Sequence, residues 1–275
     1  QNLSVGTDGD VWVTWLDHRG LVEGAEMTHR MEGAPKDGVA MAQKSKLFVA
    51  SVNQADATAL TGGVCYCCKT AMATGPDGTM YLAWRHVFTG NIRDIAISTS
   101  RDRGRTWSEP ARVSDDRWML EGCPDDGPSL AVDGQGGVHI AWPTRVEDEE
   151  GPTIGLFYAS SADGRTFTSR QRLPTEGVPH HPQVSVDARQ RVVLAWDEVV
   201  DGQRRASVAS LLRRMGNVLR VERHRVTGTA AGVYPALAMA ENGSVMVWTK
   251  GTGVDAVIGV ARVPASALAM RVVAP

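Results

Sequence analysis

The sequence predicts an all-β fold, a β-propeller of five four-stranded antiparallel blades. Three observations support this prediction: an internal repeat that ends in tryptophan, apolar–polar alternation with a period of two inside each copy, and tight turns of the Asp-Gly or Asn-Gly type between the alternating segments. No segment has a sustained helical period.

Each copy of the repeat contains an apolar strand, a tight turn and a second strand that ends in Ala, Val or Thr followed by Trp. The tryptophans are 52 to 69 residues apart: Trp15, Trp84, Trp142, Trp196 and Trp248. Because large rings bury the most area, we expect them to pack between neighbouring blades.

Two further strands follow each tryptophan. The third strands are expected at 25–30, 94–100, 156–161, 206–212 and 257–263, and the fourth at 46–52, 111–114, 170–173, 221–226 and 268–273. This predicts one domain, 1–275, with blades at approximately 1–62, 63–117, 118–174, 175–227 and 228–275. A five-bladed propeller and a six-bladed propeller lacking one blade both fit this count.

The charge balance argues against nucleic acid as a partner. The 275 residues include 29 basic and 31 acidic side chains with no run of like charge. No stretch is apolar for long enough to span a bilayer, and the chain opens on Gln1 without the basic and apolar regions of a signal peptide. We expect an extracytoplasmic protein, periplasmic or secreted, whose signal peptide is not present in this chain.

One segment carries a specific motif. Residues 100–107 read Ser-Arg-Asp-Arg-Gly-Arg-Thr-Trp and match the Asp-box pattern Ser-x-Asp-x-Gly-x-Thr-Trp, and residues 161–167 form a shortened version. The Asp carboxylate is expected to accept hydrogen bonds from its own turn, and Gly to supply the unusual φ. On these motifs the chain resembles the sialidase-like proteins with BNR or Asp-box repeats, a family of bacterial extracytoplasmic β-propellers.

The resemblance implies that the boxes lie on the face opposite the active site. Strand direction alternates within a blade, so the residues before each first strand and after each tryptophan gather on the other face, around the mouth of the central channel. Counted back from their tryptophans, Cys65 and Cys123 occupy equivalent positions, as do Cys68, Asp126 and His180. We expect these side chains to converge near the axis.

The cysteines and histidines of this rim predict a metal site. Thiolate selects Cu(I) or Zn²⁺, and imidazole suits copper and zinc, so copper is expected first and zinc second. The expected ligands are Cys65, Cys67, Cys68, Cys123, His180 and His181. A redox-active thiol is an alternative, as are structural disulfides, for example Cys65 with Cys123, with Cys67 and Cys68 paired or free.

The resemblance implies a second function, that of an exo-sialidase-like glycoside hydrolase binding a small glycan. That mechanism uses an arginine cluster for the substrate carboxylate, a Tyr nucleophile with a Glu base, and an Asp acid. By position the candidates are Arg19, Arg85 and Arg145 for the cluster, Tyr234 with Glu198 for the nucleophile pair, and Asp17 or Asp126 for the acid. The family's Arg-Ile-Pro or Arg-Leu-Pro motif before the first box is absent.

A third function is a scaffold or complex subunit whose rim docks another protein. It requires the loops around Val87-Phe88 and Trp118-Met119-Leu120 to form a contiguous exposed apolar patch. Because the cysteine cluster is the denser feature, the sequence favours metal binding or thiol redox chemistry over hydrolysis and docking.

Overall fold

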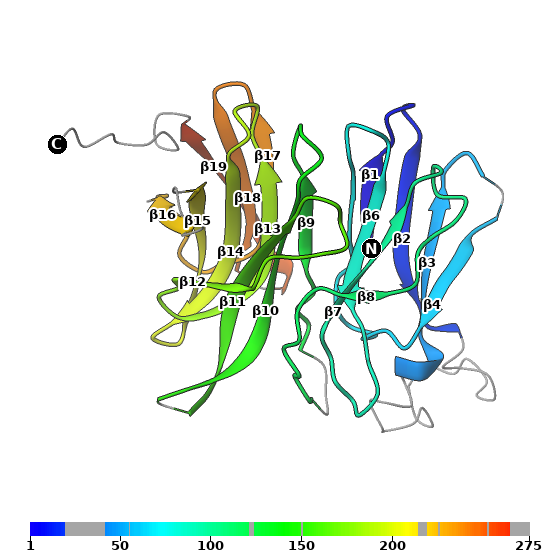
Figure 1. The fold of residues 1–275 in the computed structure, drawn as a ribbon. Helices are drawn as coiled ribbons and strands as arrows, with labels where there is room; N and C mark the ends of the chain where they lie inside the picture. Colours follow the sequence, from blue (N-terminus) through cyan, green and yellow to red (C-terminus); the bar gives the residue numbers. More distant parts are fainter. Residues whose placement is uncertain are drawn as a thin grey trace.

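The computed structural model describes residues 1–19, 42–54, 56–120, 124–149, 151–213, 219–224, 226–251 and 253–264. Within these ranges the chain forms five antiparallel sheets, and its helical segments are short, as at 42–44 and Gly253–Asp255 (Figure 1). The fold is all-β, as the sequence predicts.

The first sheet corrects one strand assignment. It contains β1 (Asn2–Val5), β2 (Val11–Asp17), β3 (Lys46–Ser51) and β4 (Thr58–Gly62), in that order. The segment at 46–52 is therefore the third strand of its blade and not the fourth, because it pairs directly with β2, with Trp15 opposite Phe48. The fourth strand, β4, was not expected, and the segment at 25–30 lies outside the described residues.

The next three sheets have the expected four strands. The second contains β5 (Ala71–Thr74), β6 (Met80–Arg85), β7 (Ile95–Ser100) and β8 (Ala111–Arg112). The third contains β9 (Ser129–Val132), β10 (Val138–Asp148), β11 (Gly151–Ser161) and β12 (Gln171–Leu173). The fourth contains β13 (Val178–Val186), β14 (Val192–Val200), β15 (Gln203–Arg213) and β16 (Leu219–His224). Each sheet follows chain order from one edge to the other.

The fifth sheet has three described strands, β17 (Gly232–Ala240), β18 (Gly243–Lys250) and β19 (Val257–Pro264). The segment expected to form its fourth strand, 268–273, lies outside the described residues.

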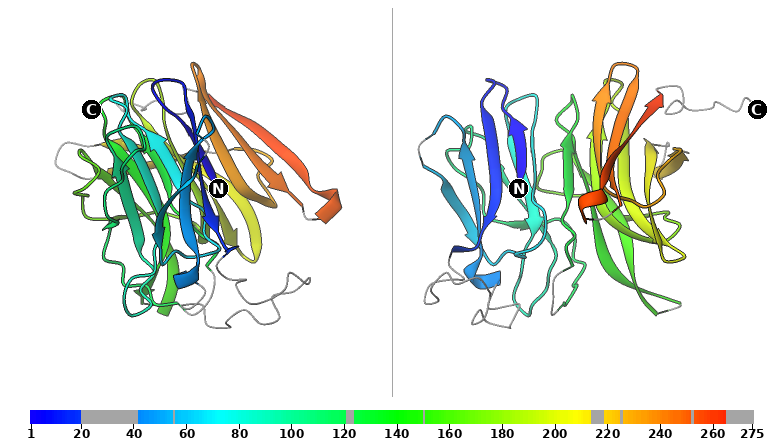
Figure 2. Two further views of the ribbon diagram at one scale, coloured as in Figure 1. Left: turned by 90° about the vertical axis from the view of Figure 1, so that its right-hand side faces the viewer. Right: turned by 180° about the vertical axis from the view of Figure 1, so that it is seen from behind.

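The sheets are arranged as successive blades. Their first strands, β1, β5, β9, β13 and β17, contact one another in turn. The first sheet lies at the right of Figure 1 and the fourth and fifth lie at the left, and Figure 2 shows the same succession from behind. The β1–β2 and β17–β18 turns lie at the top of Figure 1, and the long β10–β11 hairpin ends at the bottom. Alternate connections therefore gather on two opposite faces, as a propeller requires.

The core lies between neighbouring blades. Trp84, Trp142 and Trp196 are among the largest fully buried side chains, and each belongs to a different apolar cluster. The cluster around Trp142 joins Ile97 of the second blade to Ile140 of the third. The prediction that the repeated tryptophans pack between blades is confirmed for these rings. Trp15 is only half-buried and stacks on Phe48.

The turn at 100–107 is closed by its own side chains. Asp102 accepts hydrogen bonds from the Thr106 backbone N–H at 2.9 Å and from the Thr106 hydroxyl at 2.6 Å. Gly104 has a φ of 74°, and a Cβ at this position would lie 2.3 Å from the Trp12 ring. In the shorter turn Asp163 accepts the backbone N–H groups of residues 165 and 166. The carboxylates hold these turns as expected.

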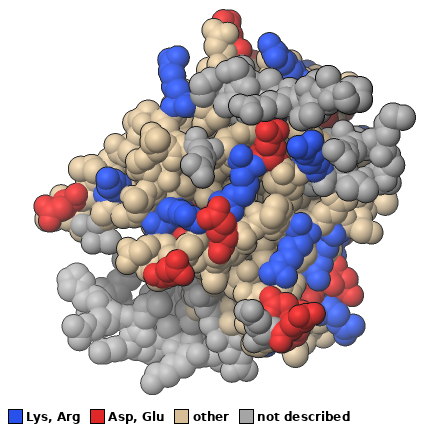
Figure 3. Space-filling view, turned by 90° about the vertical axis from the view of Figure 1, so that its left-hand side faces the viewer, with Lys and Arg blue, Asp and Glu red and all other residues tan. Residues whose placement is uncertain are grey.

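Basic and acidic side chains are interspersed on the side of the molecule seen in Figure 3. Among the described residues there is no helix with the length and apolar character to cross a bilayer. The extracytoplasmic location stays a prediction.

Candidate functional site

The candidate site joins the third and fourth blades through Asp126. This residue precedes β9, and its carboxylate accepts hydrogen bonds from His180 Nδ1 at 2.7 Å and from the His181 backbone N–H at 2.8 Å. Asp126 is 3% exposed. The structure therefore brings Asp126 and His180 into contact, and the roles assigned to them stay predictions.

Asp197 continues the network to the fifth blade. Its fully buried carboxylate accepts His181 Nδ1 at 2.7 Å, the Tyr234 backbone N–H at 3.1 Å and Arg204 Nη1 at 2.6 Å. We call Asp126, His180, His181, Asp197, Tyr234 and Arg204 the axial cluster. Because its members come from three blades, only the folded propeller assembles it.

Two residues of the axial cluster sit on strained backbone. His181 and Tyr234 lie on β13 and β17, at irregularities in the strand register. Their φ angles are 47° and 51°, and each precedes a proline, which disfavours compact conformations at the preceding residue. Bulges and positive φ at residues other than glycine concentrate at functional sites, because they aim a side chain where a regular strand does not.

The hydrogen bonds fix the ring orientation of both histidines. Each Nδ1 faces a buried carboxylate and must donate to it, so Nε2 is the nitrogen left to accept a proton from a ligand. The two imidazole rings are 5.7 Å apart, and the His181 ring is 4.1 Å from the Tyr234 ring. His181 is buried, whereas His180 is half-buried and Tyr234 is exposed.

The electrostatic balance keeps Asp126 ionised. Burial alone would raise its pKa, but the hydrogen bonds from His180 and from the His181 backbone, with the charge that these histidines carry when protonated, outweigh burial and leave the pKa below its usual value. Burial and the nearby carboxylates raise the pKa of Tyr234, so its phenol keeps its proton. Burial lowers the pKa of Lys69, although Asp126 and Asp197 oppose that shift.

The hydrogen-bond partners described for Glu198 do not include Tyr234. Adjacent residues of a strand point to opposite faces, and Glu198 follows Asp197 on β14. The Glu198 carboxylate accepts hydrogen bonds from Ser207, Arg223 and the backbone of residues 176 and 177. No described contact joins it to Tyr234, so the expected nucleophile pair is not assembled.

The three arginines proposed as a carboxylate clamp have separate partners. Arg19 is exposed and pairs with Asp17, whose pKa this hydrogen bond lowers to about 2. A carboxyl group that acidic is poorly suited to act as a general acid. Arg85 is buried and donates to the backbone carbonyls of residues 93, 126 and 143. Arg145 pairs with Glu147.

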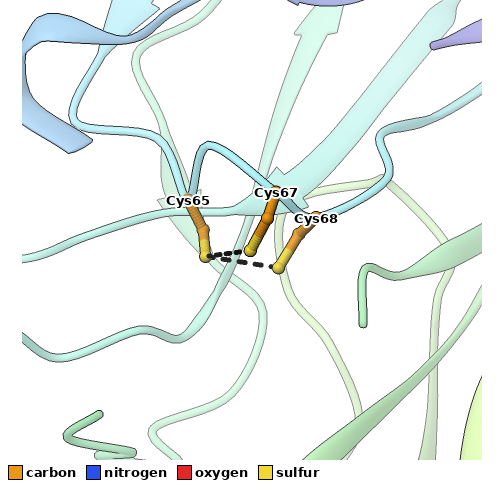
Figure 4. Close-up of side chains that lie close together, drawn as sticks. All are labelled: Cys65, Cys67 and Cys68. Atoms are coloured by element: carbon orange, nitrogen blue, oxygen red, sulfur yellow. Dashed lines mark hydrogen bonds between the residues drawn. The ribbon is translucent and has the colours of Figure 1, made fainter. Parts of the chain in front are cut away.

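Cys65, Cys67 and Cys68 lie on the loop between β4 and β5 (Figure 4), and the Asp126 backbone donates a hydrogen bond to Cys68. Cys68 donates to Cys65 with a sulfur–sulfur distance of 3.2 Å, and the Cys67 sulfur lies 3.9 Å from that of Cys65. The Cys68 hydrogen bond lowers the pKa of Cys65 to about 6, against the effect of burial and with help from the charges of Arg85 and Arg93. Burial raises the pKa of Cys68.

The predicted six-ligand metal site is not brought together as a whole. Within the described residues, the sulfurs of Cys65, Cys67 and Cys68 lie within 4.8 Å of one another, and neither His180 nor His181 joins this group. Cys67 is disulfide-bonded, and a disulfide sulfur carries no thiolate charge for a metal. Cys123 lies outside the described residues. Copper or zinc binding stays a prediction that requires a reduced Cys67.

The loops proposed for protein docking do not form an exposed apolar patch. Val87 and Trp118 are buried, and Phe88 packs against the core, which leaves Met119 as the exposed apolar side chain of these segments. A docking role at these loops therefore has no support from their surface character.

Two hollows open beside residues of this face. One, of about 620 Å³, is lined by Arg204, Arg205 and the backbone turn at 228–231, and it borders the axial cluster through Arg204. The other, of about 470 Å³, is lined in part by Arg145, Arg170 and Trp118. Arg204 was missed in the sequence, where the signal was the run Gln-Arg-Arg that opens β15 beside the predicted rim.

The comparisons with known proteins support the fold. No protein-family model matches the chain, and no curated protein sequence does. Solved structures do match. An ulvan lyase, bound to a saccharide of glucuronic acid and rhamnose 3-sulfate, is 14% identical with a TM-score of 0.55 over 94% of this chain and 65% of its own. The chain thus spans slightly less than two thirds of that lyase.

Two further solved structures belong to enzymes that act on carbohydrates. An α-L-arabinanase from Penicillium chrysogenum, complexed with arabinobiose, is 14% identical with a TM-score of 0.52 over 94% of this chain and 76% of its own. A sialidase from Trypanosoma rangeli is 13% identical with a TM-score of 0.47, over 70% of this chain and 35% of its own. At these identities the likeness shows the fold alone, and this chain is an all-β propeller with carbohydrate-active structural neighbours.

Proposed function

We propose that the protein cleaves an acidic polysaccharide at the axial cluster by β-elimination. The observation that carries this proposal is the pair of histidines whose Nδ1 atoms are each held by a buried aspartate, 2.7 Å away in both cases, next to a tyrosine and an arginine. The likeness to an ulvan lyase bound to a glucuronate saccharide agrees with it.

The ionisation of the carboxylates favours elimination over hydrolysis. A glycoside hydrolase needs a carboxylic acid whose pKa is raised so that it can protonate the leaving oxygen. In the axial cluster the pKa of Asp126 is lowered, and both Asp126 and Asp197 accept hydrogen bonds at each of their two oxygens. These carboxylates orient histidines, which leaves the proton transfers to imidazole and phenol.

The side chains can be assigned to the steps of an elimination. His180 Nε2, on the more accessible of the two rings, takes the proton on the carbon next to the uronate carboxylate. The electron pair forms a carbon–carbon double bond as the bond to the glycosidic oxygen breaks, and that oxygen takes a proton from the Tyr234 phenol. Arg204, which is held by Asp197, stabilises the negative charge that grows on the carboxylate.

The test is to incubate the protein with three substrates: a glucuronate-containing sulfated polysaccharide, a neutral arabinan and a sialyl oligosaccharide. Elimination from the first yields an unsaturated product that is detected by its ultraviolet absorbance. Hydrolysis of any substrate yields new reducing ends or free sialic acid without that absorbance. The proposal expects the unsaturated product from the acidic polysaccharide only.

Two variants and a matched control connect the activity to the site. His180→Gln and Tyr234→Phe should each lower kcat by about 10²–10⁴-fold, because a general base or acid usually contributes a rate enhancement of that size. His224→Gln is the control, because this histidine bonds Ser210 at the outer edge of the fourth blade. Cleavage that yields only reducing ends, or that survives both substitutions, overturns the proposal.

A further inference from the structure

Two thiols on the β4–β5 loop face a disulfide-bonded cysteine. Cys65 and Cys68 are free, and they have the Cys-x-x-Cys spacing of a pair that can close on itself. Cys67 lies between them in the chain and is disulfide-bonded. In Figure 4 all three side chains point to the same side of the loop. Cys65 is the central sulfur, at 3.2 Å from that of Cys68 and 3.9 Å from that of Cys67.

The surroundings of Cys65 favour a thiolate. Arg93 is fully buried and donates from Nη1 to the Cys65 sulfur at 3.5 Å, and the buried Arg85 lies close enough to act on the same sulfur by its charge. The Cys68 S–H is a second hydrogen-bond donor to the Cys65 sulfur. Buried positive charge and hydrogen-bond donors are what stabilise a reactive thiolate.

The three sulfurs differ in access to solvent. Cys65 is 1% exposed and Cys68 is 4% exposed, whereas Cys67 is half-buried. A polar reagent in the solvent therefore reaches the Cys67 sulfur more readily than the sulfur of either free thiol. Because of this difference in exposure, a thiol-specific reagent can detect whether Cys67 is released from its disulfide.

We infer that Cys65, Cys67 and Cys68 form a thiol–disulfide exchange site. The Cys65 thiolate attacks the Cys67 sulfur, a Cys65–Cys67 bond forms, and the bond between Cys67 and its partner breaks, with the partner sulfur leaving as a thiolate that takes up a proton. Cys68 then gives up its proton and attacks Cys65, which forms a Cys65–Cys68 bond and releases Cys67 as a thiol. One disulfide is exchanged for another, so no external oxidant or reductant is consumed.

The experiment traps the released Cys67 thiol. The folded protein, purified without reductant, is incubated with a polar maleimide, quenched in acid, unfolded and digested. Tandem mass spectrometry of the peptide that ends at Lys69 then locates the label. The exchange predicts that label accumulates with time on Cys67 while Cys65 and Cys68 become joined. Label on Cys65 or Cys68 beside an intact Cys67 disulfide overturns the inference, as does label on all three or on none.

Two matched variants separate the steps. Cys65→Ser removes the attacking sulfur, so Cys67 should stay unlabelled in its original disulfide. Cys68→Ser keeps the attack but blocks its resolution, so Cys67 should also stay unlabelled, now joined to Cys65. Both remove one buried sulfur from the same loop. The wild-type result stands without them if either variant does not fold, and none of these measurements depends on polysaccharide cleavage.

Discussion

Two carboxylates on opposite faces of the propeller are held by hydrogen bonds of similar length, but to partners at very different distances along the chain. Asp102, in the turn after β7, bonds only within its own turn, to Ser100 and Thr106. Asp197, on β14, bonds His181, Arg204 and the backbone of Tyr234, 37 residues later. A motif made of neighbours in sequence stabilises a hairpin, whereas partners from several blades create a site that exists only in the folded protein.

The largest expected difference between these two carboxylates is in activity. Asp197→Asn removes the charge that holds His181 and Arg204, and it should lower kcat on the acidic polysaccharide on the order of 10²–10⁴-fold, as loss of the aspartate in a His–Asp pair does elsewhere. Asp102→Asn should leave kcat unchanged. Steady-state assays of both variants check this, and equal losses would mean that the axial cluster is not the site.

In the turn at 100–107, a substitution that strains the backbone should lower the free energy of unfolding. Gly104→Ala places a Cβ on a residue with a φ of 74° and 2.3 Å from the Trp12 ring. We expect a loss of about 3 kcal/mol in the free energy of unfolding from strain and overpacking. Urea denaturation measures it, with Gly136→Ala as control, because no atom lies near that position. Equal losses would show that the Trp12 contact contributes nothing.

A third expected effect is a pH dependence of stability that comes from His86. Burial and the charge of Arg112 lower the pKa of His86 to about 4, and its Nδ1 accepts a hydrogen bond from Trp84. The unfolded chain therefore binds the proton more readily, and the stability from neutral His86 is lost as pH falls from about 6.5 to about 4.

The loss from His86 should reach about 2 kcal/mol in the free energy of unfolding, allowing for its partial exposure. Denaturant titrations across this pH range measure it, and His86→Gln, which keeps an acceptor but does not titrate, should flatten the dependence. A slope that persists in the variant would place its origin elsewhere.

The smallest expected effect is local to the box. The hydrogen bonds from Thr106 lower the pKa of Asp102 to about 2, so its stabilising contribution is complete above about pH 4 and is lost as pH falls through 2. Asp102→Ala should lower the Tm modestly at neutral pH and hardly at all near pH 2. Calorimetry at both pH values checks this, and an equal drop at both would mean that the carboxylate charge is not involved.

The sequence predicts the blades well, because their signals are local. The spacing of the tryptophans and the alternation around them are enough to place most strands. The first blade is the exception: because 25–30 also has a strand-like pattern, the sequence predicts 46–52 as a fourth strand, and only its pairing with β2 identifies it as the third.

The site is predicted less well, because burial and side-chain direction depend on the packing of several blades. Counting equivalent positions before the tryptophans correctly predicts that Asp126 and His180 lie close together. Position alone did not reveal that Arg85 donates to backbone carbonyls, or that Asp197 and not Glu198 contacts the backbone of Tyr234. The second point follows from the alternation of side chains along a strand, because the adjacent residues Asp197 and Glu198 must point to opposite faces.

Asp126 contacts both the cysteine loop and the axial cluster. Its backbone N–H donates to the Cys68 sulfur, while its carboxylate holds both histidines. The backbone at Gly127 packs closely against the cysteine loop, since a Cβ there would lie 2.0 Å from the carbonyl oxygen of Lys69. Drawing Cys68 into a disulfide would deprive Asp126 of its acceptor and shift the histidines that it carries. Samples of one protein with different oxidation histories should then turn over substrate at different rates, and the storage of a preparation becomes a variable of its assay.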